Sequence, residues 1–162
     1  MGQQRSTVHL QTSVGYLLKE ASSALRTAME AVLRPLGMNI THYSCLELLA
    51  QRPGLSNSEL ARGAFVTRQS MNVLLVSLEH DGLVTRAEHA STGRALPTEL
   101  TPKGRRQLAS ASAAVRAVED RMTSSLSDAE RAGLGDLLSR CVGSLRPDEQ
   151  GGPASQDGPA HT

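Results

Sequence analysis

Aromatic side chains are almost missing from this sequence, which has no tryptophan, two tyrosines and one phenylalanine in 162 residues. The strands of β-sandwiches are rich in aromatic residues, whereas the apolar residues here are mostly leucine, alanine and valine, so packed helices are favoured. Long hydrophobic runs are missing too. No segment is long enough to span a membrane, and the polar residues 1–12 lack the hydrophobic core of a signal peptide. We therefore expect a cytoplasmic protein with no membrane partner.

Cysteine and metal-binding motifs are also scarce. Cys45 and Cys141 have no CxxC spacing, so neither a disulfide framework nor a zinc site is indicated, and we expect both thiols to be buried and unreactive. The histidines are scattered without an HExxH motif, so no metal is expected. GxSxG, Walker and GxGxxG motifs are missing, so an enzyme is the least supported class, and we expect no catalytic residues and no cofactor.

The charges are few and unevenly distributed. The length of 162 residues suits one domain with a sizeable core, and the formal net charge of +1 does not by itself indicate a partner. Residues 52–106, however, contain eight basic and five acidic side chains, whereas residues 147–162 contain three acidic side chains and no arginine or lysine. A cationic middle is a weak form of the electrostatic footprint of a DNA-binding protein.

Two short helices are predicted next to one another between residues 56 and 81. Ser56 and Glu59 have the spacing of a capping box, and Gly63 indicates where this first helix ends. Thr67 is the expected N-cap of the second helix. The apolar residues of the second helix recur at threes and fours, at Met71, Leu74, Leu75 and Leu78. Two capped helices in this order are typical of a helix-turn-helix.

The opposite face of the second helix carries polar residues in its first turn, at Arg68, Gln69, Ser70 and Asn72. Arginine and the amides are the side chains that pair bidentately with guanine and adenine in the major groove. A merely solvated helix start would show similar residues. The position directly after a short capped helix favours base contact.

A hairpin is predicted after these helices. Residues 83–88 and 94–100 partly alternate apolar and polar side chains around a polar tip, which is typical of two short strands. Pro97 cannot donate to a strand ladder, so this part of the strand is expected at an edge or bulge. Such a pair is too small to be stable alone and suits a wing beside the two helices.

One long helix and one shorter helix are predicted before the two short helices and the hairpin. Apolar residues recur at threes and fours over residues 14–33, before Pro35 and Gly37 interrupt the helix. Thr41 is the expected N-cap of a shorter helix that supports the helix-turn-helix.

Two further helices are predicted after the wing. Thr101 and Pro102 begin one that continues to about residue 126, and a capping box at residues 127–130 opens the last. The apolar faces of the first and the last two helices exceed what the small winged unit can cover, so we infer a helical dimerisation lobe. Residues 147–162 are rich in Pro, Gly and polar residues and are expected to be disordered.

The run of residues 55–84, the hairpin, and Leu100-Thr101-Pro102-Lys103-Gly104 resemble the MarR family of dimeric bacterial transcription regulators. The resemblance covers nearly the whole chain. It implies a mainly α fold with a small two- or three-stranded β wing, in which a winged helix-turn-helix is flanked by a helical dimerisation lobe. The expected parts are a flexible N-terminus at 1–12, a single MarR-like domain at 13–146 and a disordered tail at 147–162. Within the domain, we expect the winged helix-turn-helix at about 41–101 and dimerisation helices at about 13–35 and 102–146.

The resemblance also implies how DNA is contacted. The helix after Thr67 would enter the major groove, and Arg94 at the wing tip would enter the minor groove. Many relatives have an aspartate two positions before this arginine, which orients it, but this chain has Thr92. The residues expected to contact DNA are Ser56, Ser58, Thr67, Arg68, Gln69, Ser70, Asn72, Val73, Arg86, His89, Thr92, Gly93 and Arg94.

A small aromatic ligand is a further partner implied by the resemblance, because the family often binds such molecules between its dimerisation and DNA-binding parts. Tyr16, Met38 and His42 are the candidate lining residues, with ordinary packing as the alternative for each.

The function expected from these residues and from the resemblance is that of a homodimeric transcriptional repressor. It would bind a pseudopalindromic operator in double-stranded DNA and be released by a small-molecule ligand. The alternative is a winged-helix protein-interaction module without a DNA role. Arg68, Gln69 and Asn72 favour DNA, because a protein-binding face would more often be apolar or aromatic.

Overall fold

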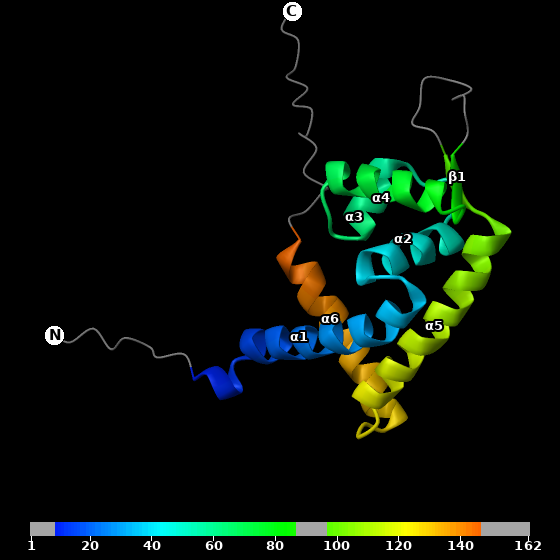
Figure 1. Cartoon of the computed structure of the whole chain (residues 1–162). Helices are drawn as coiled ribbons and strands as arrows, with labels where there is room; N and C mark the ends of the chain where they lie inside the picture. Colours follow the sequence, from blue (N-terminus) through cyan, green and yellow to red (C-terminus); the bar gives the residue numbers. More distant parts are fainter. Residues whose placement is uncertain (1–8, 87–96, 147–162) are drawn as a thin grey trace, which may run out of the picture. The chain divides into compact units, whose positions relative to one another are not determined.

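The computed structural model describes residues 9–86 and 97–146, and these residues form a mainly helical structure with a small two-stranded sheet (Figure 1). The predicted α fold with a β wing is confirmed. The chain divides into two compact units, one ending at Met122 and one beginning at Thr123. The elements are η1 (Leu10–Thr12), α1 (Val14–Leu33), η2 (Arg34–Leu36), α2 (Ile40–Gln51), α3 (Asn57–Gly63), α4 (Arg68–His80), β1 (Val84–Arg86), β2 (Thr98–Leu100), α5 (Pro102–Met122) and α6 (Asp128–Leu145).

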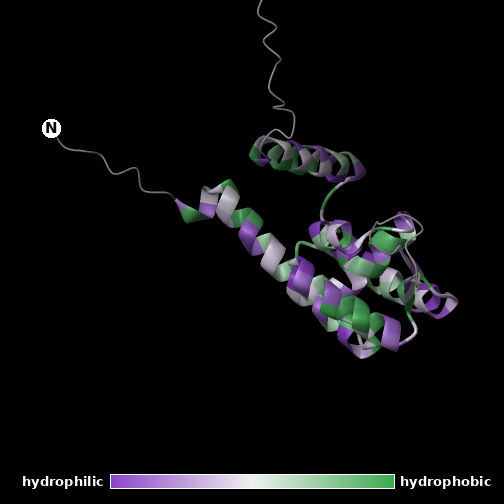
Figure 2. Ribbon diagram, turned by 90° about the horizontal axis from the view of Figure 1, so that it is seen from above, coloured by the Kyte–Doolittle hydropathy of each residue, from purple (hydrophilic) through white to green (hydrophobic). Residues whose placement is uncertain are grey.

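The core of the first unit is built from the predicted apolar faces. Hydrophobic and hydrophilic residues alternate along the helical ribbons (Figure 2). Leu46 of α2, Leu60 of α3 and Leu75 of α4 are fully buried together with residues from the sheet and from α5. All four apolar residues predicted for the inner face of α4 are buried. The helix-turn-helix is therefore held by side chains that converge from α2, α3, α4, α5 and the sheet.

The sheet is a short antiparallel pair. Val84 pairs with Leu100 and Arg86 with Thr98, and the intervening Thr85 and Glu99 are both exposed. The buried and exposed residues thus alternate as the period of a strand requires. Residues 87–96, which contain the predicted wing tip, lie outside the described residues.

The end of α4, the start of β1 and the start of α5 meet at one hydrogen-bonded junction. Thr101 Oγ1 donates to the carbonyl of Gly82 at 2.6 Å and accepts from the amide of Gly104 at 3.0 Å, so Thr101 is the predicted N-cap of α5. Gly82 has a φ of 70°, in the left-handed region that favours glycine. A Cβ at Gly104 would collide with the carbonyl of Leu83. This close approach ties the helix-turn-helix to the long helix α5.

Two side-chain hydrogen bonds attach α5 to the elements before the helix-turn-helix. Gln107 Nε2 donates to the carbonyl of Leu36 at 3.1 Å, and Ser112 Oγ donates to Glu47 Oε2 at 3.0 Å. These bonds join residues far apart in the sequence and orient α2 on α5.

The start of α2 corrects one sequence prediction. Asn39, and not Thr41, is the N-cap: Asn39 Oδ1 accepts from the amide of His42 at 2.9 Å, and His42 Nδ1 accepts from the amide of Asn39 at 3.2 Å. An N-cap residue has extended backbone, as Asn39 does (φ −118°, ψ 177°), whereas Thr41 lies inside the helix. Helix α5 also ends at Met122, before the predicted end near residue 126.

The second unit contains α6, which begins at the predicted capping box of Ser127 and Glu130. Its apolar side chains are exposed in the single chain, as are several near the start of α1. The exposed residues are Leu134, Leu137, Leu138, Val142 and Leu145 of α6 and Val14, Tyr16, Leu17 and Leu18 of α1. Among the described residues, no helix has the length and apolar character needed to cross a membrane.

Candidate nucleic-acid interface

The start of α3 is fixed by the predicted capping box. Glu59 Oε2 accepts from the amide of Ser56 at 2.8 Å, and Ser56 Oγ accepts from the amide of Glu59 at 3.3 Å. The hydrogen bonds from Ser56 hold the pKa of Glu59 below its usual value. Ser56 and Ser58 are both half-buried at this helix start. They lie at the start of α3, directly before α4, the recognition helix that is predicted to enter the major groove.

The start of α4 is fixed by Thr67, also as predicted. Thr67 Oγ1 accepts from the amide of Ser70 at 3.1 Å and donates to Ser70 Oγ at 2.9 Å. Asn57 Nδ2 of α3 donates to the carbonyl of Arg68 at 3.1 Å, so the first turns of the two helices are joined directly. Because Ser70 Oγ accepts from Thr67, its own hydroxyl hydrogen remains to donate to an anionic oxygen such as phosphate.

The structure places the predicted base-reading residues on the exposed side of α4. Arg68, Gln69, Asn72 and Val73 are all exposed, whereas Met71 between them is fully buried. The side chains predicted to contact bases are therefore held outward by the packing of the inner face.

Two apolar residues on the exposed surface of the helix-turn-helix were not singled out as site residues from the sequence. Val76 of α4 is 52% exposed. The sequence feature that could have identified Val76 is its position three residues after Val73, on the same face of the helix. Phe65 lies in the turn between α3 and α4, is 88% exposed and has a φ of 56°. Such a backbone is uncommon for a residue other than glycine, and no residue type predicts it from sequence.

The predicted wing residues are only partly described. Arg86 of β1 is half-buried, and its Nε and Nη2 donate to Glu79 Oε2 of α4 at 3.0 and 2.8 Å. Arg86 is therefore already paired with a carboxylate. The other wing predictions, His89, Thr92, Gly93 and Arg94, lie outside the described residues.

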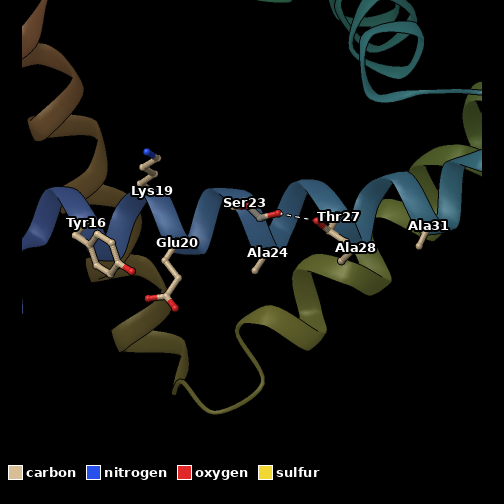
Figure 3. Close-up of a pocket in the computed structure, with 8 residues that line it drawn as sticks. All are labelled: Tyr16, Lys19, Glu20, Ser23, Ala24, Thr27, Ala28 and Ala31. Carbon is tan, nitrogen blue, oxygen red and sulfur yellow. Dashed lines mark hydrogen bonds between the residues drawn. The ribbon is translucent and has the colours of Figure 1, made fainter. Parts of the chain in front are cut away.

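The three predicted ligand residues do not line one site. Met38 and His42 line a cavity of about 220 Å³ at the C-terminal end of α4. Its other lining residues are Gly37, Leu78, Asp81, Leu83, Lys103 and Gln107. Tyr16 instead lies on an open groove along α1, with Lys19, Glu20, Ser23, Ala24, Thr27, Ala28 and Ala31 (Figure 3). Within one chain Tyr16 is therefore separated from Met38 and His42, because α1 places Tyr16 near its start and Met38 follows its end. That the three residues share one ligand site stays a prediction.

The cavity has both apolar and charged groups. Burial lowers the pKa of His42, while the charge of Asp81 acts in the opposite direction. Because His42 Nδ1 accepts a hydrogen bond from Asn39, the proton of the neutral ring is on Nε2. Lys103 Nζ donates to the carbonyl of Asp81 at 2.7 Å. The cavity therefore offers an ammonium group and an imidazole N–H beside apolar walls.

The thiols differ from one another. Cys45 is buried, as predicted, and burial raises its pKa to about 12, which keeps it protonated and unreactive at neutral pH. Cys141 is exposed on α6, so the prediction of a buried thiol is wrong there for the single chain. Within the described ranges, no three His, Cys, Asp or Glu residues are grouped so that they could hold a metal ion.

Comparison with known proteins relates this geometry to a family. Residues 36–95 match the sequence model of the MarR family. The chain is 45% identical over 113 residues to the HTH-type transcriptional repressor Rv2887 of Mycobacterium tuberculosis, an alignment that covers 70% of this chain and 81% of that protein.

Solved structures of Rv2887 are similar along most of the chain. Its complex with DNA has a TM-score of 0.68 at 38% identity and covers 80% of this chain and 98% of that one. Its complex with salicylic acid has a TM-score of 0.67 at 40% identity and covers 80% of this chain and 96% of that one.

Proposed function

The chain belongs to the MarR family of DNA-binding transcription regulators, and on that basis we propose that it is a homodimeric repressor that inserts α4 of each protomer into the major groove of a pseudopalindromic operator. The observation that carries the proposal is the exposed polar start of α4, with Arg68, Gln69 and Asn72. Arginine reads guanine, and the two amides read adenine, by paired hydrogen bonds. The two-fold symmetry of a dimer accounts for two half-sites about one helical turn apart.

Other polar groups at the starts of α3 and α4 position the recognition helix on the DNA backbone. Ser70 donates to phosphate through its remaining hydroxyl hydrogen, while Thr67 holds the start of the helix. Ser56 and Ser58 bring the start of α3 to the same backbone. Val73, which cannot form a hydrogen bond, contacts a base edge.

The wing supplies a second contact. Arg94 enters the neighbouring minor groove, where narrow A·T-rich grooves concentrate negative potential. We propose that His89, Thr92 and Gly93 contact the DNA beside Arg94, and that Arg86 meets a phosphate. Because threonine has no carboxylate with which to orient an arginine, we expect Arg94 to contribute less than in relatives that have an aspartate at the position of Thr92.

Binding to operator and to scrambled DNA tests the major-groove assignment. The operator is obtained by footprinting the region upstream of the gene for this chain. Gln69→Ala and Asn72→Ala should each lose roughly 1–3 kcal/mol on the operator and much less on scrambled DNA. Gln51→Ala, which removes an exposed amide from α2, is the matched control and should bind as the wild type does. Equal losses on both duplexes would show that neither residue reads sequence.

We also propose that a single-ring aromatic acid releases the repressor by binding in the cavity of Met38 and His42. The salicylic acid complex of Rv2887, at 40% identity, supports this ligand class. A volume of about 220 Å³ is below the roughly 300–1,000 Å³ of sites for drug-sized ligands and suits one ring. Lys103 and His42 Nε2–H would hold the carboxylate, and Leu78 and Leu83 would contact the ring. The ligand would then touch the end of α4 itself.

Titration of the protein–DNA complex with salicylic acid tests this site. DNA should be released from the wild type, and Lys103→Met should bind DNA but need much more salicylic acid for release. Lys19→Met on the α1 groove is the control and should respond as the wild type. An unchanged response of Lys103→Met would place the ligand elsewhere.

The alternative function is a protein-interaction module, and the 88% exposure of Phe65 is the observation that favours it. A salt titration on duplex DNA separates the two functions. If the chain is a DNA-binding regulator, its affinity for DNA should fall steeply as the salt concentration rises. Each phosphate contact should contribute about 0.9 to the slope of log affinity against log salt. Absence of binding even at low salt would favour the interaction module. Neither of the two functions requires catalytic activity, and we propose none.

A further inference from the structure

We infer that Val73 and Val76 read the 5-methyl groups of thymine, so that the centre of the recognition surface selects A·T pairs by apolar contact. The inference rests on the proposed entry of α4 into the major groove. It adds apolar contacts with thymine to the hydrogen bonds by which Gln69 and Asn72 are proposed to read adenine.

The two valines lie at the centre of the outward face of α4. The buried residues of this helix are Met71, Leu74, Leu75 and Leu78. With 3.6 residues per turn, the side directly opposite contains residues at i, i+4, i+7 and i+11. These residues are Gln69, Val73, Val76 and His80, all of which are exposed. Arg68 and Asn72 lie toward one flank of this row, and Ser77 lies toward the other.

Folding does not account for valine at these positions. Val73 is 67% exposed and Val76 is 52% exposed, so neither gains much from burial in the core. Valine is also a poorer helix former than the alanine, lysine or glutamate common at exposed helical positions, because its branched side chain is restricted at χ1. The exposed neighbours Asn72, Ser77 and Glu79 are polar. An apolar pair in this setting indicates a contact made with a partner.

The partner that fits is a thymine edge. In the major groove, thymine alone presents a methyl group, whereas the other base edges present donors and acceptors that a valine would leave unpaired. A three-residue step along α4 is about 4.5 Å, somewhat more than the roughly 3.4 Å between base pairs, so the valines suit neighbouring base pairs. Gln69 lies one turn before Val73, on the side away from Val76, and its amide suits an adenine there. The row therefore predicts a short A·T run in each half-site.

Deoxyuridine substitution provides the test, since it removes only the methyl group of one thymine. On the operator selected by the wild type, one or two positions in each half-site should lose about threefold to fivefold in affinity, the size expected for one buried methyl group. Val73→Ala and Val76→Ala should each lose a similar factor on the thymine duplex and become insensitive to uracil at one position. Val73→Thr, which keeps the shape but adds a hydroxyl, should also bind the thymine duplex less tightly.

Ser77→Ala on the flank of the same helix is the matched control and should distinguish thymine from uracil as the wild type does. Thermal melting should show that all variants remain folded, because the substituted residues are exposed. If uracil at every thymine leaves wild-type affinity unchanged while Gln69→Ala still lowers it, the methyl contact is wrong but the DNA-binding function stands. If the wild type binds no DNA at low salt, the proposed function itself fails. Valine variants that bind and discriminate as the wild type would also overturn the inference.

Discussion

Arg86 of β1 and Glu79 of α4 form an ion pair in which both Nε and Nη2 of the arginine donate to the same oxygen, Glu79 Oε2, at 3.0 and 2.8 Å. The pair joins the end of the recognition helix to the base of the wing. The Glu79 side chain is 42% exposed, so the pair contributes little to stability, about 0–1 kcal/mol. We expect its main effect to be on the charge presented to DNA, because a carboxylate neutralises the arginine proposed to meet a phosphate.

Glu79→Gln should therefore tighten DNA binding at low salt, since Arg86 then carries an uncompensated charge. The slope of log affinity against log salt should become steeper by up to about 0.9, the value for one phosphate contact, because Glu79 no longer offsets the charge that Arg86 brings to its phosphate. Fluorescence anisotropy over a series of salt concentrations measures both quantities. Glu30→Gln, which breaks the pair between Arg26 and Glu30 on α1, removes the same charge and serves as the control. Weaker DNA binding by Glu79→Gln would mean that the main effect of Glu79 is to orient Arg86 and not to neutralise its charge.

Phe65 has a left-handed backbone, which costs a residue other than glycine about 1–2 kcal/mol. Its side chain is 88% exposed and gains little from packing. Phe65→Gly should accordingly be more stable than Phe65→Ala, by about 1 kcal/mol, which reverses the usual order of the two residues. Urea unfolding of both variants measures the difference. An alanine variant that is more stable than the glycine variant would show that position 65 does not hold this backbone in solution.

Gly104 cannot carry a side chain without a shift of the backbone, because its Cβ would meet the carbonyl of Leu83. Gly104→Ala should lower the free energy of unfolding by roughly 1–3 kcal/mol. Gly135→Ala in α6 is the control, since no atom lies within 4 Å of the added Cβ, and it should be neutral or stabilising by up to about 1 kcal/mol. Equal melting temperatures for the two variants would contradict the close approach at the start of α5.

His42 should make the stability of the protein depend on pH. Burial lowers its pKa in the folded chain below the ordinary value of 6.5, so the unfolded chain takes up the proton first as the pH falls. The contribution of neutral His42 to the free energy of unfolding is fully present above pH 6.5 and declines as the pH falls below it. Protonation also removes the hydrogen-bond acceptor at His42 Nδ1. His42→Gln keeps an acceptor for the capping box but cannot be protonated, so it should lose less stability between about pH 7.5 and about pH 5.5.

Chemical denaturation at the two pH values tests this prediction. His80→Gln, which removes an exposed histidine of α4, is the control for the loss of an imidazole elsewhere in the chain. The same pH dependence in His42→Gln as in the wild type would assign the effect to other groups.

Leu138 of α6 should lie in the dimer interface, because it belongs to the exposed apolar row of that helix. Leu138→Glu places a charge there and should yield monomers or unfolded protein, as burial of an unpaired charge is costly. Light scattering at micromolar concentration measures the mass. Ala132→Glu, on the opposite side of the same helix, introduces the same charge and should remain dimeric. A wild type that is a well-folded monomer would contradict the dimer model.

The sequence alone was sufficient for those features that depend on neighbours three or four residues apart. The capping boxes at Ser56 and Ser127, the N-cap at Thr67 and the buried face of α4 all follow from local spacing, and each is present in the structure. The same local rules failed at Thr41, because Asn39 also has a capping side chain and His42 completes its box. Where two residues compete for one N-cap, sequence spacing alone does not choose between them.

Only the tertiary structure decided which distant groups meet. The pairing of Arg86 with Glu79, the packing of Gly104 on Leu83, and the separation of Tyr16 from Met38 and His42 all depend on how helices cross, which the order of residues does not state. Val76 shows the difference most clearly. Its place on the outward face follows from helical spacing, but its 52% exposure is known only from how the opposite face packs against the core. Burial is a property of the assembled fold, because the surface removed from water at one residue is supplied by elements far away in the chain.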